Sequence, residues 1–222
     1  METSEECLNA PGDCEGVTRH PLSYPDRWLR LSAQNRERIL HKYRDINVDY
    51  SFWDEYLIAD FKEEMSDIGF EVYDVHWTGF WMQGSGASFS GRVDDFQRFS
   101  AAVGVELTMT ENAYFKVYER HTHCMYSDDD LFFADPKYEH PLKQAAWLQA
   151  CKQATASWEE FTERALKLCN DKAYDFYRRL EAEYEYQTSD EQVLETLYDN
   201  EHILEDELNE HERCEEADDL AE

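Results

Sequence analysis

Residues 70–93 have the sequence FEVYDVHWTGFWMQGSGASFSGRV, and this stretch decides the fold class. From Phe70 to Trp77 apolar and polar side chains alternate with a period of two, which indicates a strand. The Gln-Gly-Ser-Gly segment at 83–86 predicts a turn whose glycines supply positive φ angles. Residues 87–93 then resume the strand pattern. The stretch therefore predicts a strand-turn-strand unit and a small antiparallel sheet.

Two helices are expected before this unit, over residues 29–43 and 52–68. The second has a capping-box spacing at its start, with Ser51 and Asp54 three residues apart. Gly69 stands where a C-terminal glycine ends a helix. Apolar residues recur in this segment at helical spacing: Trp53, Leu57, Phe61, Met65 and Ile68. This stripe predicts that one helix face is buried.

After the strands the pattern becomes helical again, with one interruption. Residues 94–103 predict a short helix, and 113–126 a further strand or hairpin. We expect a loop at the aspartates 128–130, followed by helix from Leu142 onward. Thr188-Ser189-Asp190-Glu191 predicts the start of a last helix, buried through Leu194, Leu197, Leu204 and Leu208. The order of helices, small antiparallel sheet and C-terminal helical bundle predicts the α+β class.

Composition sets the expected domain organisation. We predict a flexible arm at 1–25, a single α+β domain at 26–210 and an acidic tail at 211–222. No apolar run is long enough to span a membrane, and the first residues do not resemble a signal peptide. The six cysteines are scattered without a paired motif, which favours reduced thiols in a cytoplasmic protein.

The chain is strongly acidic, with 50 Asp and Glu against 21 Lys and Arg and a formal net charge of −29. Residues 189–222 contain fifteen acidic side chains and one basic one, Arg213. Such a charge repels nucleic acid and anionic lipid and attracts basic surfaces. We therefore expect no direct binding to nucleic acid or membrane. Salt adaptation is an alternative origin of the charge, but six cysteines and thirty-two aromatic residues disfavour it.

Three motifs are candidates for chemical sites. The glycine turn lacks the Lys-Ser/Thr of a phosphate loop. His121, His123 and Cys124 form the densest set of metal ligands or nucleophiles, and on a strand the two histidines would share one face, with Cys124 on the other. This segment lacks a third ligand on the histidine face, although Asp128–Asp130 are close in sequence, so we favour a strand end with a packed or exposed histidine pair. Asp128-Asp129-Asp130 resembles half a calcium loop without its glycine. We expect no catalytic residue, no metal and no cofactor.

The last helix carries the strongest candidate site. Its acidic residues follow helical spacing opposite the leucines: Glu191, Glu195, Asp199, Asp206 and Glu210. An ordinary solvated helix face is the competing interpretation. Solvent-exposed helix faces usually carry both acidic and basic residues, because opposite charges at positions i and i+4 stabilise the helix. This helix has almost no basic residues, so its carboxylates repel one another. As a continuous helix, 34 residues would span roughly 50 Å with one carboxylate per ~3.4 Å, close to the phosphate spacing along one DNA strand.

Three stretches resemble a family of phage and prophage proteins. The family's strand-turn-strand motif, Ser-Gly-Phe-Trp-Ser-Gln-Gly-Asp-Gly-Ala-Ser-Phe, is similar to residues 78–89 and differs at Thr78, Met82 and Ser85. Residues 121–125 and 188–193 are similar to its two other motifs. The resemblance implies a small phage-encoded protein, and some family members are described as antitoxins. It implies no catalytic residue.

The acidic surface and the phage context together predict an inhibitor that mimics DNA. Its partner would be a basic nucleic-acid-binding host protein in the host cytoplasm, such as a restriction enzyme, a CRISPR effector or a nuclease. The helical carboxylates and the aspartates 128–130 are the expected partner-binding residues. The alternative is an antitoxin-like interaction protein with a basic partner, and an enzyme using His121, His123 and Cys124 is the third class. Homodimerisation stays open.

Overall fold

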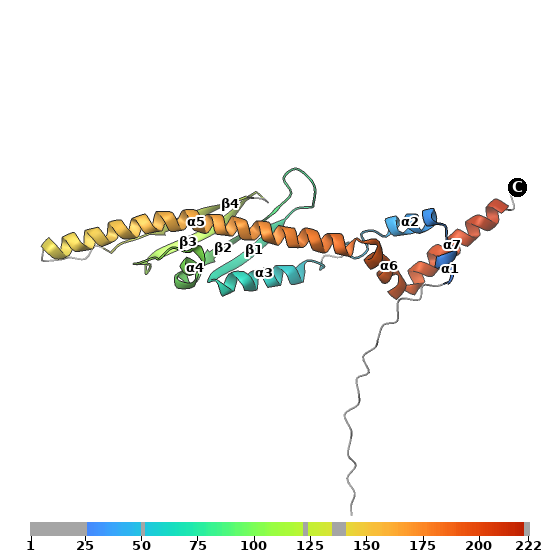
Figure 1. Cartoon of the computed structure of the whole chain (residues 1–222), viewed down its shortest axis with the longest axis horizontal. Helices are drawn as coiled ribbons and strands as arrows, with labels where there is room; N and C mark the ends of the chain where they lie inside the picture. Colours follow the sequence, from blue (N-terminus) through green and yellow to red (C-terminus); the bar gives the residue numbers. More distant parts are fainter. Residues whose placement is uncertain (1–25, 50–51, 122–123, 135–140, 220–222) are drawn as a thin grey trace, which may run out of the picture. The chain divides into compact units, whose positions relative to one another are not determined.

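The computed structural model describes residues 26–49, 52–121, 124–134 and 141–219 of the chain (Figure 1). The described residues form seven helices and four strands. The helices are α1 (Asp26–Arg30), α2 (Ala33–Lys42), α3 (Glu55–Asp67), α4 (Phe96–Val103), α5 (Pro141–Gln187), α6 (Asp190–Asp199) and α7 (Glu201–Asp219). The strands are β1 (Phe70–Trp77), β2 (Ala87–Val93), β3 (Ala113–His121) and β4 (Cys124–Leu131). The predicted α+β class is confirmed.

The strands form one antiparallel sheet in the order β1-β2-β3-β4. The predicted first hairpin is confirmed, and its turn contains Gly84 at φ 89°. The second hairpin is also confirmed, but its outer strand is longer than expected. The aspartates at 128–130, predicted as a loop, are residues of β4 and pair with 114–116 of β3. Strand pairing with an aromatic, apolar partner overrides the low β-propensity of aspartate here.

Helices α3, α4 and α5 pack on one face of the sheet through aromatic side chains. Phe61 of α3 lies 5.2 Å from Phe89 of β2 and 4.7 Å from Phe176 of α5, measured between ring centroids. Phe99 and Phe161 continue this contact from α4 to α5. All of these phenylalanines are fully buried. Ring pairs at such distances add to the free energy gained by burying the rings.

Glycine allows the close approach of two of these elements. Gly69 ends α3 with φ 86°, as predicted, and its carbonyl accepts hydrogen bonds from the backbone N–H groups of Asp94 and Asp95. Asp95 then caps α4, since its carboxylate accepts from the N–H groups of Gln97 and Arg98. Gly69 and Asp95 therefore bring the C-terminal end of α3 into contact with the N-terminal end of α4.

Two predictions about the helices before the sheet are wrong. The segment predicted as one helix over 29–43 is two helices, because Ser32 caps α2 by accepting from the N–H of Asn35. Helix α3 begins at Glu55, and Asp54 makes no side-chain capping bond. Its carboxylate instead accepts from the indole N–H of Trp77 at 2.7 Å. The Ser51 half of the predicted capping box lies outside the described residues.

The predicted last helix is also two helices, separated at Asn200. The Asn200 side chain donates to the carbonyl oxygen of Thr196, and the Asn200 carbonyl accepts from the N–H of Ile203. Asn200 therefore ends α6 and leads into α7. The predicted start is confirmed, because the Ser189 hydroxyl accepts from the N–H of Gln192 as an N-cap does.

The chain forms two compact units. One comprises residues 44–192 and contains the sheet with α3, α4 and α5. The other combines 1–43 with 193–222, and its described part contains α1, α2, most of α6, and α7. These units do not coincide with the predicted ranges 26–210 and 211–222, and α7 continues through residue 219. The predicted arm at 1–25 lies outside the described residues.

Candidate partner-binding surfaces

Helices α6 and α7 separate apolar from acidic side chains. Their buried side chains are Val193, Leu197, Leu204 and Leu208. Leu194, predicted to be buried with them, is half-buried. Glu191, Asp199, Asp206 and Glu210 are exposed, as are Glu201 and Glu205. Of the five predicted carboxylates on these helices, Glu195 is half-buried and forms an interaction of its own, so it contributes least to the exposed acidic surface.

The N-terminal helices place positive charge beside α7. The Lys42 ammonium forms an ion pair with Glu207, and the Tyr43 hydroxyl donates to the same carboxylate at 2.6 Å. Burial alone would raise the pKa of Glu207, but the hydrogen bonds from Lys42 and Tyr43 outweigh it and hold the pKa below its ordinary value. Arg27 of α1 donates to the Asn209 side chain at 2.8 Å. One side of α7 is therefore neutralised within the chain.

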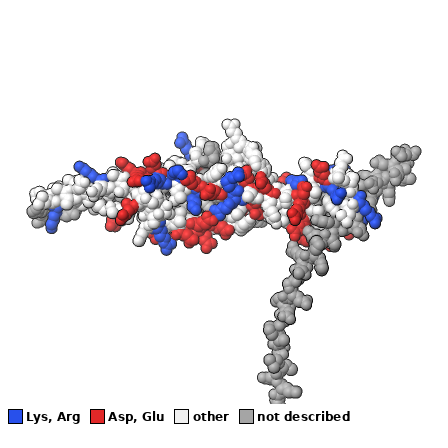
Figure 2. Space-filling model, viewed as in Figure 1, with Lys and Arg blue, Asp and Glu red and all other residues white. Residues whose placement is uncertain are grey.

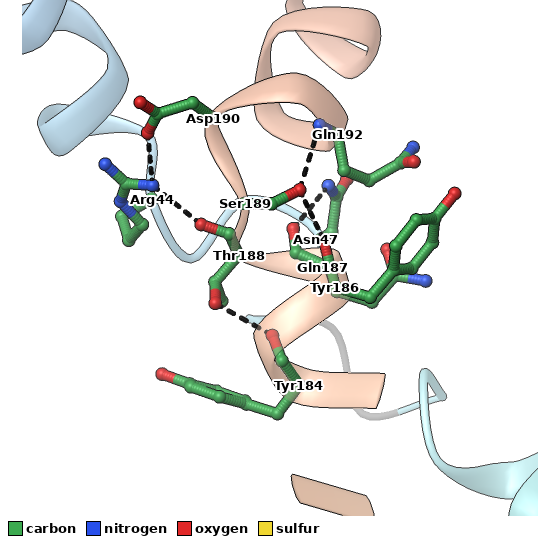
Figure 3. Close-up of polar contacts among 9 residues, drawn as sticks. All are labelled: Arg44, Asn47, Tyr184, Tyr186, Gln187, Thr188, Ser189, Asp190 and Gln192. Atoms are coloured by element: carbon green, nitrogen blue, oxygen red, sulfur yellow. Dashed lines mark hydrogen bonds and ion pairs between the residues drawn. The ribbon is translucent and has the colours of Figure 1, made fainter. Parts of the chain in front are cut away.

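Polar contacts join Arg44 and Asn47 to residues 187–190, where α5 ends and α6 begins (Figure 3). The Arg44 guanidinium donates to the Thr188 carbonyl oxygen at 2.7 Å and forms an ion pair with Asp190 at 2.6 Å. The Asn47 side chain donates to the Gln187 carbonyl oxygen at 3.0 Å. These bonds satisfy carbonyl groups that the end of α5 leaves without helical partners.

The aspartates of β4 differ from one another. Asp129 accepts a hydrogen bond from the Trp158 indole at 3.2 Å and so joins β4 to α5. Asp130 accepts from the N–H of Leu131, whereas Asp128 is exposed and lies 3.4 Å from the Tyr114 hydroxyl. Charged side chains on a terminal strand also disfavour pairing with a further strand. Asp129 therefore has a structural role. Residues 128–130 and α7 belong to different compact units.

The described residues offer little basis for a metal or thiol site. Among them, no group of three or more His, Cys, Asp or Glu side chains could hold a metal ion. His121 ends β3 and Cys124 begins β4, while His123 lies outside the described residues. Burial raises the pKa of the Cys169 thiol, which keeps it protonated and unreactive. No described helix has the length and apolarity needed to cross a membrane.

Positive and negative charges alternate over α5 on the face shown in Figure 2. Arg164 pairs with Glu160, and Arg178 pairs with Glu181. Arg179 makes two bonds to the Glu64 carboxylate of α3, at 2.6 and 3.1 Å. The acidic excess of this unit is thus partly compensated by ion pairs of its own helices.

Sequence reasoning did not identify one exposed apolar feature, the β1–β2 loop. Trp81 is 66% exposed and Met82 is 69% exposed, although both follow the buried Phe80. Trp81 also has φ 59°, a left-handed conformation that is rare for a bulky residue. The sequence contains a usable signal, because 75–93 is a run of nineteen residues without Asp or Glu in a very acidic chain.

The chain belongs to the family described as a domain of unknown function (DUF8835), whose model matches residues 53–190. No curated protein and no solved structure matches the chain. The matched range covers nearly all of the compact unit 44–192. It includes the β1–β2 loop and the β4 aspartates. The acidic residues from Glu191 onward lie outside it.

Proposed function

We propose that the protein is a phage-encoded inhibitor that binds a basic nucleic-acid-binding host protein and competes with DNA. The observation that carries the proposal is the exposed set of carboxylates on α6 and α7, opposite the buried leucines of the same helices. Over its 19 residues α7 spans about 28 Å. It carries ten acidic residues and one basic residue over that length. This charge density is comparable to that of a DNA strand.

The packing of α1 and α2 on α7 supports this function in a specific way. Lys42 and Tyr43 bind the Glu207 carboxylate of α7. Asp206 and Glu210 remain exposed, with Glu201 and Glu205. A helix held on one side and acidic on the other can place carboxylates at lysine and arginine positions that otherwise bind phosphates. Binding would release counterions from both surfaces.

The turn at Asn200 changes the predicted geometry of the mimic. The acidic residues lie on two helices rather than on one continuous rod of 34 residues. Glu191 and Asp199 belong to α6, and Asp206 and Glu210 belong to α7. A bent pair of acidic helices suits a curved basic groove, such as the groove of an enzyme that encloses duplex DNA.

The test is a competition assay on purified targets. A panel of restriction enzymes, CRISPR effectors and nucleases would be assayed for DNA cleavage with increasing concentrations of the protein. We expect inhibition of at least one target, relieved by excess uncleavable duplex DNA and weakened steeply by salt. Inhibition that duplex DNA does not relieve would instead support an antitoxin-like protein with a single cognate partner. An absence of inhibition across the panel would contradict the proposal.

A further inference from the structure

The β1–β2 loop exposes two large apolar side chains, Trp81 and Met82, and hydrogen bonds hold its backbone in one conformation. The Met82 N–H donates to the Ser85 hydroxyl at 3.1 Å, and the Ser85 N–H donates back to the Met82 carbonyl oxygen at 3.1 Å. Below them the N–H of Thr78 bonds the Gly86 carbonyl. The turn is thus fixed by its own hydrogen bonds, and it holds Trp81 and Met82 with most of their surface exposed to solvent.

Aromatic packing fixes the base of this loop. Phe80 is buried, with its ring stacked 5.5 Å from Trp77 and 4.9 Å from Tyr184 of α5. The Trp81 ring lies at the outer side of this cluster, 5.7 Å from the Phe80 ring and 5.7 Å from the Tyr184 ring. A positive φ at a tryptophan costs free energy that burial of Trp81 does not recover, since the side chain is mostly exposed. Strain of this kind at an exposed aromatic residue is typical of binding sites.

A small hollow lies beside the loop. It has a volume of about 110 Å³ and is lined by Ser85, Gly86, Ala87, Asn170, Tyr174 and Tyr177. Tyr174 is 64% exposed, and Tyr177 packs on Phe80 at 5.5 Å. The hollow has room for one medium-sized side chain of a partner. Exposed Trp, Met and Tyr next to a hollow match the composition of the central part of protein interfaces.

The charge of the chain decides what kind of partner fits. Residues 75–93 contain no acidic residue, and depletion of charge is a property of interface centres. Residues 44–192 as a whole contain 30 acidic and 14 basic residues, so the compact unit that carries the loop is acidic overall. A second copy of the chain would bring −29 against −29. A basic protein would instead be attracted by the net negative charge of the chain and could bury apolar side chains against the loop.

We infer that Trp81 and Met82 are the apolar anchor for a basic protein partner, with the hollow at Tyr174 and Tyr177 receiving one apolar side chain of that partner. This inference rests on the proposed function, because it takes the partner to be the same basic protein. It assigns the two surfaces different contributions. The carboxylates of α6 and α7 provide salt-dependent attraction, and the loop provides salt-independent affinity.

The test uses two synthetic peptides of equal length and equal positive charge. One has leucines between its lysines, and the other has serines. Binding to the full chain would be measured by fluorescence anisotropy over a range of salt concentrations. We expect the leucine peptide to bind roughly tenfold more tightly than the serine peptide, as for a single interface hot spot. The double variant Trp81→Asn and Met82→Ser should lose this preference and keep the salt dependence. Asn is chosen because it tolerates positive φ.

Matched controls separate this inference from the proposed function. Leu148→Ser with Phe132→Ser removes two other exposed apolar side chains and should keep the leucine preference. Neutralising Asp206 and Glu210 should reduce the salt dependence of binding for both peptides and keep the leucine preference. If the salt dependence is unchanged, the proposed function is wrong while the inference about Trp81 and Met82 is unaffected. If the Trp81/Met82 variant still prefers the leucine peptide, Trp81 and Met82 are not the apolar binding residues and the inference is wrong.

Two other occupants would also overturn the inference. A dimer of the parent chain that forms with rising concentration and is lost in the Trp81/Met82 variant would identify a second copy as the occupant. Binding of the parent to neutral phosphatidylcholine vesicles, lost in the same variant, would identify a lipid surface. Analytical ultracentrifugation and vesicle sedimentation measure these outcomes directly.

Discussion

The hydroxyl of Tyr43 donates a hydrogen bond to the carboxylate of Glu207 at 2.6 Å, across a sequence separation of 164 residues. This contact brings the basic N-terminal helices against the most acidic helix of the chain. Residues 26–43 contain five basic and two acidic side chains. The acidity of α7 is therefore asymmetric, with one side neutralised by the chain and the other exposed.

The Glu207 contact predicts a pH-dependent stability. A carboxyl whose folded pKa lies below the ordinary value of 4.5 stabilises the fold above that pH. This stabilisation is lost as the pH falls through the folded pKa. Thermal unfolding should show the parent more stable than Glu207→Gln at neutral pH, with the difference shrinking below about pH 4.5. A difference that stays constant down to strongly acidic pH would contradict the assigned ion pair.

The aspartates of β4 should separate into structural and solvent-exposed residues. Asp129→Ala leaves the indole N–H of the buried Trp158 without its acceptor, so we expect a loss of about 1–2 kcal/mol. Asp129→Asn keeps an acceptor and should recover most of that loss. Asp128→Ala should change stability by less than about 0.5 kcal/mol. Chemical denaturation of the three variants measures these differences, and equal effects at both positions would show that the assigned Trp158 bond is wrong.

Two glycines of the first hairpin should respond differently to the same substitution. A Cβ on Gly91 would lie 2.3 Å from the Glu71 carbonyl oxygen and 2.5 Å from the Phe70 ring. Gly91→Ala should therefore cost about 3 kcal/mol through overpacking. Gly84 has φ 89° and open space around it, so Gly84→Ala should cost about 1–2 kcal/mol from backbone strain alone. The order of the two unfolding midpoints checks this, and it should not reverse.

Phe80 and Trp81 are adjacent but should have opposite effects on stability. Phe80 is 8% exposed among aromatic rings, so Phe80→Ala should cost about 3–5 kcal/mol. Trp81 is exposed and strained, so Trp81→Gly should leave the free energy of unfolding unchanged or raise it slightly. A large loss of stability in Trp81→Gly would mean that Trp81 is a packing residue, and it would remove the basis of the proposed anchor.

Much of the fold is accessible from the sequence. The alternation over 70–77 and the glycine turn predict the first hairpin, because a period of two places alternate side chains on opposite faces of a strand. The boundaries are less accessible. Asp54 has the position of a capping residue, but its carboxylate bonds Trp77 from a distant strand. The spacing of residues along the chain does not show that a side chain from another element will take the place of a capping bond. It also does not show that the last helix breaks at Asn200.

The candidate site shows the same division. The acidic spacing correctly predicts the exposed Asp206 and Glu210 on α7, because the leucines of that helix are buried. On α6 it is less accurate, since Leu194 and Glu195 are both half-buried. Compensation by Lys42 and Tyr43 could not be predicted, since it depends on two segments more than 160 residues apart. The exposure of Trp81 was not predicted either. An aromatic residue in an apolar run is usually buried, and the absence of acidic residues from 75–93 singles out the segment without showing which of its side chains is exposed.

The sharpest experiment on the proposed inhibitor compares two variants with the same change in charge. The first neutralises exposed residues of α6 and α7: Asp199→Asn, Glu205→Gln, Asp206→Asn and Glu210→Gln. The second neutralises four exposed residues of the other unit: Asp60→Asn, Glu63→Gln, Asp67→Asn and Glu159→Gln. Asp206 and Glu210 are a like-charge i,i+4 pair, so the first variant should unfold at a slightly higher temperature than the parent.

Inhibition of the DNA-cleaving target and the melting temperature would be measured on both variants and the parent. We expect the α6–α7 variant to inhibit at least tenfold more weakly than the parent while its melting temperature rises, and the variant of the other unit to inhibit like the parent. A tenfold loss corresponds to about 1.4 kcal/mol of binding free energy. If the α6–α7 variant inhibits as well as the parent, the exposed carboxylates of these helices are a solvated surface and the proposed DNA mimicry is wrong.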